Sequence, residues 1–485
     1  MKIRELLQSI RKDEAKLLIV GLGISGIESI KFCLRNNLKF VAVERQSREE
    51  LYRKSKFQAE LEQIFREDNE IYFEIDGEKL KQKLQNVRLA VLSPGVPVDS
   101  AVCSVLNREG VPFISELELG IELQALPSIV VTGSNGKSTT VSLIHEMLKK
   151  AGWDSVLCGN VGIPVIASCD LGENKSVQDA NKVLVVEASS YQIETCNILK
   201  PKVALLLNIS ENHLERHGDI NRYLRIKSKI FERQDRNDLA IINADHAKIA
   251  GLYPGIRARV SAIGVSKKDQ KYHTYSRIDY RPSASVDKID FEGESYDISS
   301  SKLRGIHNRY NISAAICAVR EMGVAAEIIQ AAINDFQPLE HRLEMVGKIK
   351  QIDCINDSKS TTVASSAAAL STVLAERGQA KITVMLGGLS KAGSWDPLCK
   401  LLKENLSALN KVVCFGKDAG LIGNYCKTFQ VPFIVCANLE SAVREAFRLT
   451  NPQDILLFTP GCASFDEFKD FEARGRAFKQ LCNLK

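Results

Sequence analysis

The sequence lacks the features that mark membrane, secreted and zinc-binding proteins. Its 13 cysteines are scattered and include no Cys-x-x-Cys pair, which argues against a zinc site and favours reduced thiols buried as small apolar side chains. No apolar run approaches the length needed to cross a bilayer, and the opening MKIRELLQSIRKDE is charged where a signal peptide would be apolar. We therefore expect a cytoplasmic protein without membrane insertion.

The chain also lacks a strong charge of either sign. It has 65 basic and 59 acidic residues, a formal charge of +6, and no run of lysine and arginine with interleaved aromatic residues. A nucleic-acid partner is therefore not expected, and the charge is typical of a solvated surface. With 485 residues the chain is too long for one hydrophobic core, and its length predicts about three domains.

What the sequence does contain is an alternation of short apolar runs with helical patterns. The runs end in small or polar residues and read KLLIVGLG, KFVAVE, VRLAVLSPG, SIVVTG, KVLVVEASS, KVALLLNIS, CINDSKS, ITVMLGG, VVCFG and DILLFTPG. This alternation predicts an α/β fold of parallel sheets covered by helices, with ligands bound at the carboxyl ends of the strands. We place domain boundaries near Ser115 and Pro338, and expect a β excursion at about 265–300. The predicted domains are a Rossmann-like domain (1–115), a central P-loop ATPase-like domain (116–338) and a second Rossmann-like domain (339–485).

The stretch VVTGSNGKSTTVSL, residues 130–143, resembles a phosphate-binding loop that lacks its first glycine, because Val131 stands at that position. Gly133 and Gly136 let backbone N–H groups point at a phosphate, and the following helix adds a favourable dipole. Lys137 can reach the β- and γ-phosphates, and the Ser138 hydroxyl can bind Mg²⁺. The alternative is an ordinary strand-to-helix turn with a chance Gly-Lys-Ser.

Three further residues of the central region are candidates for the same site. Glu187 ends the apolar run KVLVVE, where an acidic side chain can hold the Mg²⁺ of a nucleotide. His213, in NISENHLERHG, follows the next apolar run, but a lone histidine is a weak signal. Lys227 shares one helical face with Tyr223 and Phe231, and by itself is better interpreted as a solvated lysine with a snorkelling stem.

Near the N-terminus, Gly21, Gly23 and Gly26 form a G-x-G-x-x-G turn between an apolar run and a helix, and Glu44 ends the next run. This is the dinucleotide fingerprint in its expected context, and alone it suggests NAD. More generally it fits any diphosphate on a helix N-terminus, including that of a nucleotide sugar. The segment Ser93-Pro94-Gly95 follows another strand-like run and is positioned to line the same site.

Taken in order, the motifs TGSNGKSTT, GNVGIP, EASSYQIE, NISENHLERHG, GIHNRYN, HRLE, NDSKST, LGGLSK and PGCASFDEF resemble those of the Mur ligases over nearly the whole chain. That family's loop resembles TG[ST]NGK[ST], so Val131 is expected there. The ending CASFDEFKDFEARG and the absence of Asp-Asn-Pro-Arg favour the branch that adds D-glutamate over the branch that adds diaminopimelate or lysine.

The resemblance implies an ATP-dependent ligase of peptidoglycan synthesis that joins D-glutamate to UDP-N-acetylmuramoyl-L-alanine through an acyl phosphate, as a monomer with ATP and two Mg²⁺. Lys227 would be carbamylated and, with Glu187, His213 and Ser138, would face the metals, while Lys137, His213 and Lys227 would be catalytic. The implied ATP site comprises Gly133, Asn135, Gly136, Lys137, Ser138, Thr139, Asn308, Asn311, Arg342 and Asp357. The implied UDP-substrate site comprises Gly23, Ser25, Gly26, Glu44, Arg45, Ser93, Pro94, Gly95 and Asn160. The implied D-glutamate site comprises Thr361, Lys391, Ser464, Phe465 and Phe471.

The sequence departs from the family pattern at three places. Asn212 stands before His213 where aspartate is usual, Glu44-Arg45-Gln46 replaces a pattern close to Asp-Thr-Arg, and Phe465 replaces a common leucine. Three other functions fit parts of the sequence. They are another Mur ligase or a folylpolyglutamate synthase, an NAD-dependent dehydrogenase based on the glycine-rich turn, and a P-loop ATPase that only binds.

Overall fold

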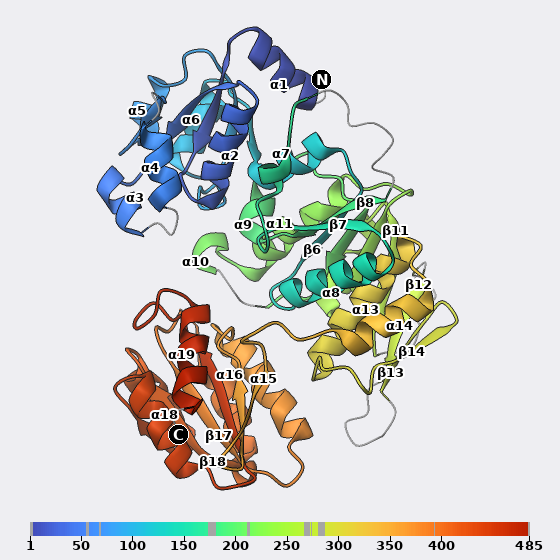
Figure 1. The fold of residues 1–485 in the computed structure, drawn as a ribbon, viewed down its shortest axis with the longest axis vertical. Helices are drawn as coiled ribbons and strands as arrows, with labels where there is room; N and C mark the ends of the chain where they lie inside the picture. The colour runs from blue at the N-terminus through green and yellow to red at the C-terminus, as the bar shows by residue number, and fades with distance from the viewer. Residues whose placement is uncertain are drawn as a thin grey trace. The chain divides into compact units, whose positions relative to one another are not determined.

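A computed structural model describes residues 3–54, 58–66, 69–172, 181–210, 214–265, 272, 274–279, 287–391 and 393–483 (Figure 1). The chain forms two compact units. The first comprises Met1–Ile278, Asp290–Tyr296 and Asn311–Ile333, and the second comprises Asp279–Ile289, Asp297–Tyr310 and Asn334–Lys485.

The first unit begins with a parallel five-stranded sheet in the order β3-β2-β1-β4-β5. Its strands are β1 (Lys16–Val20), β2 (Lys39–Val43), β3 (Ile71–Tyr72), β4 (Val87–Leu92) and β5 (Phe113–Ser115). Its helices are α1 (Ile3–Lys12), α2 (Ile24–Arg35), α3 (Arg48–Lys54), α4 (Gln58–Arg66), α5 (Gly77–Lys81), α6 (Ala101–Arg108) and α7 (Glu116–Gln124). The strand order reverses between β1 and β4, which places the loops after these two strands at a ligand-binding switch point.

A nine-stranded sheet follows in the order β14-β13-β12-β11-β10-β9-β6-β8-β7. Its strands are β6 (Ser128–Thr132), β7 (Asp154–Gly159), β8 (Lys182–Glu187), β9 (Val203–Leu206), β10 (Leu239–Asn243), β11 (Arg259–Gly264), β12 (Thr274–Asp279), β13 (Lys288–Phe291) and β14 (Glu294–Asp297). Its helices are α8 (Lys137–Lys150), α9 (Ser190–Glu194), α10 (Leu214–His217), α11 (Ile220–Glu232), α12 (Ala247–Ala250), α13 (Ile306–Glu321) and α14 (Ala326–Asp335). Strand β6 lies between β8 and β9, so the loop after β6 opens at a second switch point.

The second unit contains a six-stranded sheet in the order β15-β16-β20-β17-β18-β19. Its strands are β15 (Glu344–Ile349), β16 (Ile352–Asn356), β17 (Ile382–Gly387), β18 (Leu409–Phe415), β19 (Phe433–Val435) and β20 (Ile455–Gly461). Its helices are α15 (Val363–Glu376), α16 (Asp396–Glu404), α17 (Ala419–Thr428), α18 (Leu439–Leu449) and α19 (Phe471–Asn483). Only the β15–β16 pair is antiparallel among the pairings described in this sheet.

The α/β fold predicted from the sequence is confirmed. Every apolar run quoted above contains a strand, and strands β12 to β14 occupy the predicted β excursion. The interiors of the central strands β6, β8, β9, β10, β17 and β20 are buried on both faces, as expected where helices cover a parallel sheet. All 13 cysteines are free and buried, as predicted for thiols that fill the core. In the described part of the chain, no helix combines the length and apolarity that a membrane crossing requires.

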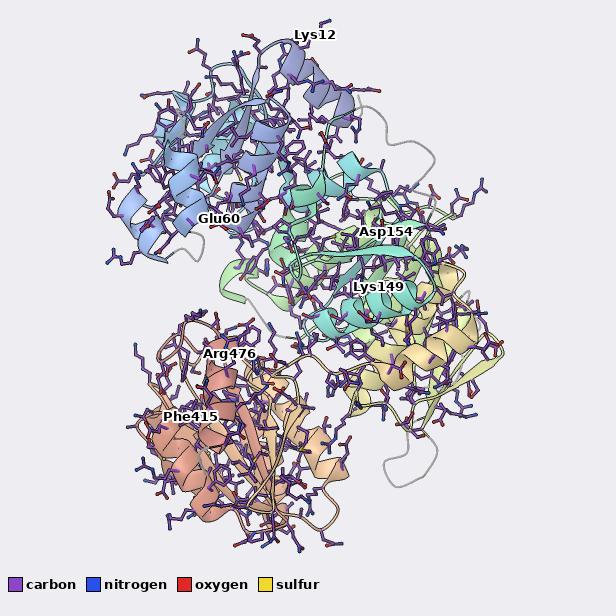
Figure 2. The ribbon with its side chains drawn as sticks, in the orientation of Figure 1. Lys12, Glu60, Lys149, Asp154, Phe415 and Arg476 are labelled. Carbon is purple, nitrogen blue, oxygen red and sulfur yellow. The ribbon has the colours of Figure 1, made fainter. Side chains whose placement is uncertain are left out.

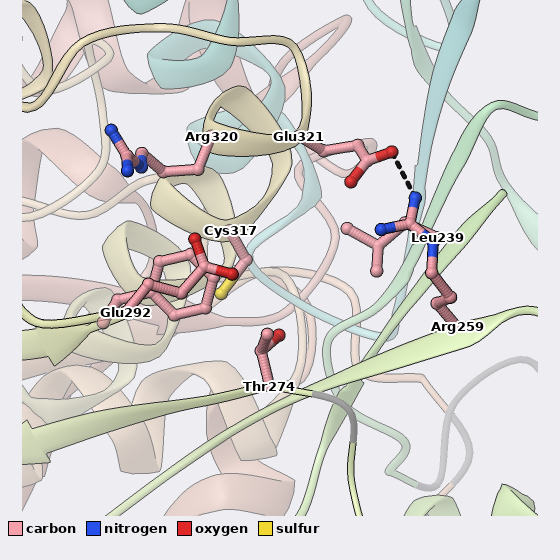
Figure 3. Close-up of a pocket in the computed structure, with 8 residues that line it drawn as sticks. Leu239, Arg259, Thr274, Glu292, Cys317, Arg320 and Glu321 are labelled. Atoms are coloured by element: carbon pink, nitrogen blue, oxygen red, sulfur yellow. Dashed lines mark hydrogen bonds and ion pairs between the residues drawn. The ribbon is translucent and has the colours of Figure 1, made fainter. Parts of the chain in front are cut away.

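A cavity of about 60 Å³ lies among β10, β11, β12 and α13, and its lining includes Arg259, Arg320 and Glu321 (Figure 3). Arg259 donates to Glu321, and the Nε of Arg320 is buried without a hydrogen-bond partner among the described residues. Small-molecule sites measure roughly 300–1,000 Å³. This cavity therefore suits a few water molecules rather than a nucleotide.

Candidate functional site

The loop between β6 and α8 is held open by two glycines and one asparagine. Gly136 has φ +85°, and a Cβ at Gly136 would lie 2.3 Å from Asn311 Oδ1, so a larger residue is excluded there. Asn208 follows β9 and holds the loop from the other side. Its Oδ1 accepts from the Asn135 N–H at 2.8 Å, and its Nδ2 donates to the Asn135 carbonyl at 3.0 Å. Asn208 is not among the residues predicted from the sequence.

The start of α8 presents the side chains that a phosphate loop requires. Lys137 Nζ donates to the carbonyls of Gly133 and Ser134 at 2.9 and 3.0 Å, so the ammonium lies over the loop. Ser138 and Thr139 are buried in the first turn, where the N-terminal N–H groups favour an anion. Val141, Ile144 and Leu148 share one face of this helix and are fully buried.

Glu187 ends β8 beside this loop, and its side chain is 2% exposed. Its Oε1 accepts from Asn160 Nδ2 at 2.7 Å, while its Oε2 is buried without a hydrogen-bond partner among the described residues. A buried carboxylate oxygen without a donor is costly unless a cation meets it. Ser138, Glu187 and the loop are therefore an oxygen donor set that fits Mg²⁺.

Lys227 lies on the buried face of α11, together with Tyr223 and Phe231, as the spacing predicts. It is 1% exposed, its Nζ donates to Thr132 Oγ1 at 3.1 Å, and it lies 4.8 Å from the centroid of the Tyr223 ring. Burial, and secondarily Lys137, holds its pKa well below the ordinary lysine value, while Glu187 opposes that shift. The interpretation as a solvated lysine is therefore wrong. His213 and the preceding Asn212 lie outside the described residues.

Helix α13 carries the two asparagines that were predicted to belong to the ATP site. Asn308, in its first turn, is 9% exposed and donates from Nδ2 to the Arg304 carbonyl at 2.7 Å. Asn311, one turn later, is 3% exposed and faces Gly136 of the phosphate loop.

The glycine-rich turn after β1 is closed by a contact that only glycine permits. A Cβ at Gly26 would lie 1.9 Å from the Gly21 carbonyl oxygen, whereas a Cβ at Gly23 would meet nothing within 4 Å. Ser93 Oγ donates to the same Gly21 carbonyl at 2.7 Å, which joins the loops after β1 and β4. Ser25 Oγ donates to the buried carboxylate of Glu116 at 3.2 Å.

Glu44 lies where a dinucleotide-binding protein has its ribose ligand, but its oxygens already have partners. Oε2 accepts from the Leu22 N–H at 2.7 Å, and Oε1 accepts from the Arg45 and Gln46 N–H groups. Arg45 beside it is exposed. The carboxylate therefore fastens the glycine-rich loop to the end of β2.

Arg216 on α10 is a second residue that the sequence analysis did not identify. Its guanidinium donates to the carbonyls of Gly95 and Val96 at 3.2 and 2.9 Å, next to Ser93 and Pro94. It also donates through Nε and Nη2 to Glu194 Oε2, and this carboxylate is buried. The loop after β4 is thus bonded to the helix that follows the segment of His213.

In the second unit, Asp357 follows β16 and is 6% exposed. Its carboxylate accepts from Ser360 Oγ, from Thr459 Oγ1 at 3.0 Å and from the Leu343 N–H at 3.1 Å. Burial raises the pKa of Asp357 to about 6, although these hydrogen bonds and Arg342 oppose the shift. Arg342 is half-buried in the turn that precedes β15.

The predicted amino-acid site lies at the carboxyl ends of β16, β17 and β20. The loops after β17 and β20 are joined by two backbone hydrogen bonds between Leu389 and Ala463, each 2.9 Å long. Ser464 is buried, and Phe465 is 71% exposed. The remaining predicted residues are Lys391, which is exposed, and Thr361 and Phe471, which are half-buried.

The chain matches two family models, the Mur ligase middle domain over residues 131–319 and the Mur ligase, glutamate ligase domain over residues 341–462. It is also similar to curated proteins named UDP-N-acetylmuramoylalanine--D-glutamate ligase. The protein of Koribacter versatilis is 33% identical, with 96% of each chain covered. The protein of Acidobacterium capsulatum is 34% identical, with 96% of this chain and 95% of the relative covered.

Solved structures of similar fold include UDP-N-acetylmuramate-alanine ligase MurC from Thermotoga maritima. It is 18% identical, with a TM-score of 0.57 and with 97% of this chain and 100% of that chain covered. MurF ligase from Thermotoga maritima in complex with ADP is also 18% identical, with a TM-score of 0.57 and coverage of 84% and 92%. These likenesses agree with the α/β architecture described above.

Proposed function

Because the chain belongs to the Mur ligase family, we propose that it joins D-glutamate to UDP-N-acetylmuramoyl-L-alanine in an ATP-dependent step of peptidoglycan synthesis. The observation that carries this proposal is the similarity to D-glutamate ligases over about 96% of the chain. The family resemblance alone leaves other amino acids possible. The similarity to D-glutamate ligases favours D-glutamate.

ATP is required because a carboxylate is a poor acyl donor. The substrate carboxylate attacks the γ-phosphate, which gives an acyl phosphate and ADP, and the D-glutamate amine then displaces phosphate to form the amide. Lys137, whose ammonium lies over the loop, would stabilise the charge that develops on the transferred phosphoryl group, and the loop N–H groups would orient the phosphates. Bound Mg²⁺ would supply further positive charge at the γ-phosphate.

Two side chains near the phosphate loop offer the oxygen ligands that Mg²⁺ requires. Ser138 and the donor-free Oε2 of Glu187 would bind it, and Asn160 holds Glu187 in orientation through its other oxygen. We assign His213 to a second Mg²⁺ on the resemblance alone.

We further propose that Lys227 is carbamylated. Burial favours its neutral amine, which is the form that can attack carbon dioxide. Addition of the amine to carbon dioxide, with release of one proton, would convert the neutral side chain into a carboxylate-like group that could face the metals.

The substrate sites are assigned on the family resemblance. The joined loops after β1 and β4 (Gly23, Ser25, Gly26, Ser93, Pro94 and Gly95) form the proposed site for the UDP group, with Arg45 exposed beside them. On the same resemblance, Asn308, Asn311, Arg342 and Asp357 are assigned to ATP binding, and the loops at the edge of the third sheet are assigned to D-glutamate binding. These assignments, the monomeric state and the domain boundaries at 115 and 338 are part of the proposal, as is a cytoplasmic location, where ATP is available.

The deciding experiment measures phosphate release from ATP with UDP-N-acetylmuramoyl-L-alanine and one amino acid at a time. We expect turnover with D-glutamate and none with L-alanine, L-glutamate, lysine or diaminopimelate. Turnover with one of these and none with D-glutamate would contradict the proposal. Release of phosphate that needs no amino acid would favour a simple ATPase, and NAD-dependent turnover without ATP would favour a dehydrogenase.

A further inference from the structure

One buried arginine donates hydrogen bonds to loops that carry the proposed D-glutamate residues. Arg474, in the first turns of α19, is 1% exposed. Its Nε donates to Ser358 Oγ at 3.1 Å and its Nη2 to the Ser358 carbonyl at 2.9 Å. Its Nη1 donates to the Cys462 carbonyl at 3.0 Å. A single planar guanidinium therefore joins the loop after β16 to the loop after β20.

The loop after β17 lies close to the guanidinium of Arg474. A Cβ at Gly388 would lie 3.1 Å from Arg474 Nη1 and 2.4 Å from the Ala463 carbonyl oxygen, so the backbone of this loop approaches the guanidinium closely. Ser358 extends the connection, because its Oγ donates to the Phe471 carbonyl at 2.8 Å. The five proposed D-glutamate residues (Thr361, Lys391, Ser464, Phe465 and Phe471) lie on the two loops to which Arg474 donates, on the loop that closely approaches it, and on its own helix.

The charge of Arg474 is not balanced by a close ion pair. No carboxylate in the described part of the chain lies within 4.0 Å of its guanidinium nitrogens, and Asp357, Asp466 and Glu467 act on it only from a longer distance. Taking an arginine out of water without a paired carboxylate carries a large desolvation penalty. Its hydrogen bonds here go to one hydroxyl and two carbonyl groups, which gives it a geometric role in the loops rather than a role in ion pairing.

We propose that Arg474 is a positioning residue for the amino-acid substrate, because it fixes the spacing of the three loops that surround the D-glutamate site. The inference rests on the proposed function. Asp357, which belongs to the proposed ATP site, is held by Ser360, Thr459 and Leu343 and has no hydrogen bond to Arg474. Formation of the acyl phosphate should therefore not require the arginine, whereas attack by the amine should.

The test compares Arg474→Lys, which keeps the charge but not the planar fork, with Arg474→Met in the full-length protein. For both we expect the KM for D-glutamate to rise about 10- to 100-fold, because a small misplacement of a reacting group has an effect of that size. The KM values for ATP and UDP-N-acetylmuramoyl-L-alanine should change less than about threefold, within the normal scatter of additive effects. Acyl phosphate trapped with hydroxylamine should form at the wild-type rate. Arg476→Met on the same helix is the matched control, since Arg476 is exposed (Figure 2).

Ser358→Ala provides a second variant that leaves the arginine in place and removes its Nε acceptor. We expect the same selective rise in the KM for D-glutamate, and a combined Ser358→Ala, Arg474→Lys variant that is less impaired than the product of the single effects. An unchanged KM for D-glutamate in Arg474→Lys and Ser358→Ala would overturn the inference, as would an equal loss of acyl phosphate formation. If the wild-type protein itself forms no acyl phosphate, the proposed function fails instead.

Discussion

At the residue scale, the proposed catalytic cluster consists of Lys137, Glu187 and Lys227, and the charges of Lys137 and Glu187 act on Lys227. Lys227 is fully buried, Glu187 has one carboxylate oxygen without a donor, and Lys137 lies over its own loop. Burial, and secondarily the charge of Lys137, lowers the pKa of Lys227, whereas the Glu187 carboxylate raises it. A negative group added at this cluster, either a bound phosphate or a carbamate on Lys227, would therefore be stabilised by the neighbouring positive charge.

Replacement of Lys137 by alanine tests the phosphate side of this cluster. Without the ammonium, the charge on the transferred phosphoryl group loses its nearest protein cation, and we expect acyl phosphate formation to fall by about 10²–10³-fold or more. Hydroxylamine trapping with ATP and UDP-N-acetylmuramoyl-L-alanine measures this step directly. Lys149→Ala, at the exposed end of the same helix, serves as control, and near-normal trapping in Lys137→Ala would refute the assignment of the loop.

Replacement of Lys227 by alanine tests the carbamate. We expect loss of ligase activity and partial recovery with millimolar formate or acetate, because a short carboxylate can occupy the space of the missing carbamate. Arg225→Ala, on the exposed face of α11, should behave as wild type. Full activity of Lys227→Ala without added carboxylate would argue against carbamylation.

At the scale of elements, the glycine-rich turn shows which glycine the fold requires. In Gly26→Ala the new Cβ would lie 1.9 Å from the Gly21 carbonyl oxygen, so the turn must open, and we expect a loss of about 1–3 kcal/mol of stability. In Gly23→Ala the space is open and φ is −74°, a value that alanine adopts readily. Thermal unfolding of the two variants measures the difference, and equal melting temperatures would contradict the described turn.

Helix α7 carries a buried carboxylate that makes stability depend on pH. Burial raises the pKa of Glu116 from 4.5 to about 7, although hydrogen bonds from Ile166 N and Ser25 Oγ oppose the shift. Between these pH values the folded protein retains a proton that the unfolded chain has released. The free energy of unfolding therefore falls as the pH rises, by at most about 1.4 kcal/mol per pH unit from this group.

Glu116→Gln should remove this contribution, because an amide can accept from Ile166 and donate to Ser25 without titrating. We expect the urea midpoint to fall less between pH 5 and pH 7.5 in Glu116→Gln than in the wild type. Glu78→Gln, whose side chain is 86% exposed, is the matched control. Identical pH dependence in all three proteins would show that Glu116 is not buried as described.

The sequence predicts elements better than contacts, for a physical reason. Strands such as KVLVVE and the buried face of α11 can be predicted because the spacing of apolar residues within a short stretch of sequence is enough to indicate them. Asn208, Arg216 and Arg474 bond to partners 73, 120 and 116 positions away, and no local pattern encodes such pairs. Lys227 is only partly predictable from the sequence. The helical face on which it lies follows from local spacing, but its burial depends on the sheet packed against that helix. The family and its reaction became recognisable through the order of motifs, and the comparisons confirm both.

At the scale of the whole molecule, the two compact units provide separate sets of buried thiols. The first unit contains Cys33, Cys103, Cys158, Cys169, Cys196 and Cys317. The second contains Cys354, Cys399, Cys414, Cys426, Cys436, Cys462 and Cys482. If each unit unfolds cooperatively, the thiols within a unit become reactive together.

Pulsed alkylation in increasing urea, followed by peptide mass spectrometry, tests this expectation. We expect slow labelling of all 13 thiols in native buffer and two groups of thiols, one for each unit, as urea rises. A single transition for all thiols would show that the units unfold as one. Rapid native labelling of any cysteine would contradict its burial.

The pairing of Leu389 with Ala463 has a consequence for how this enzyme can acquire new substrates. The two loops are joined through main-chain atoms alone, so replacement of the side chains beside them leaves the joint intact. Phe465, which is largely exposed, lies two residues beyond Ala463 and replaces a leucine common in the family. If the proposed D-glutamate site is correct, the side chains that select the amino acid are distinct from the main-chain hydrogen bonds that hold the two loops together. Directed evolution of Phe465 and its neighbours should then change the amino acid accepted without unfolding the loops.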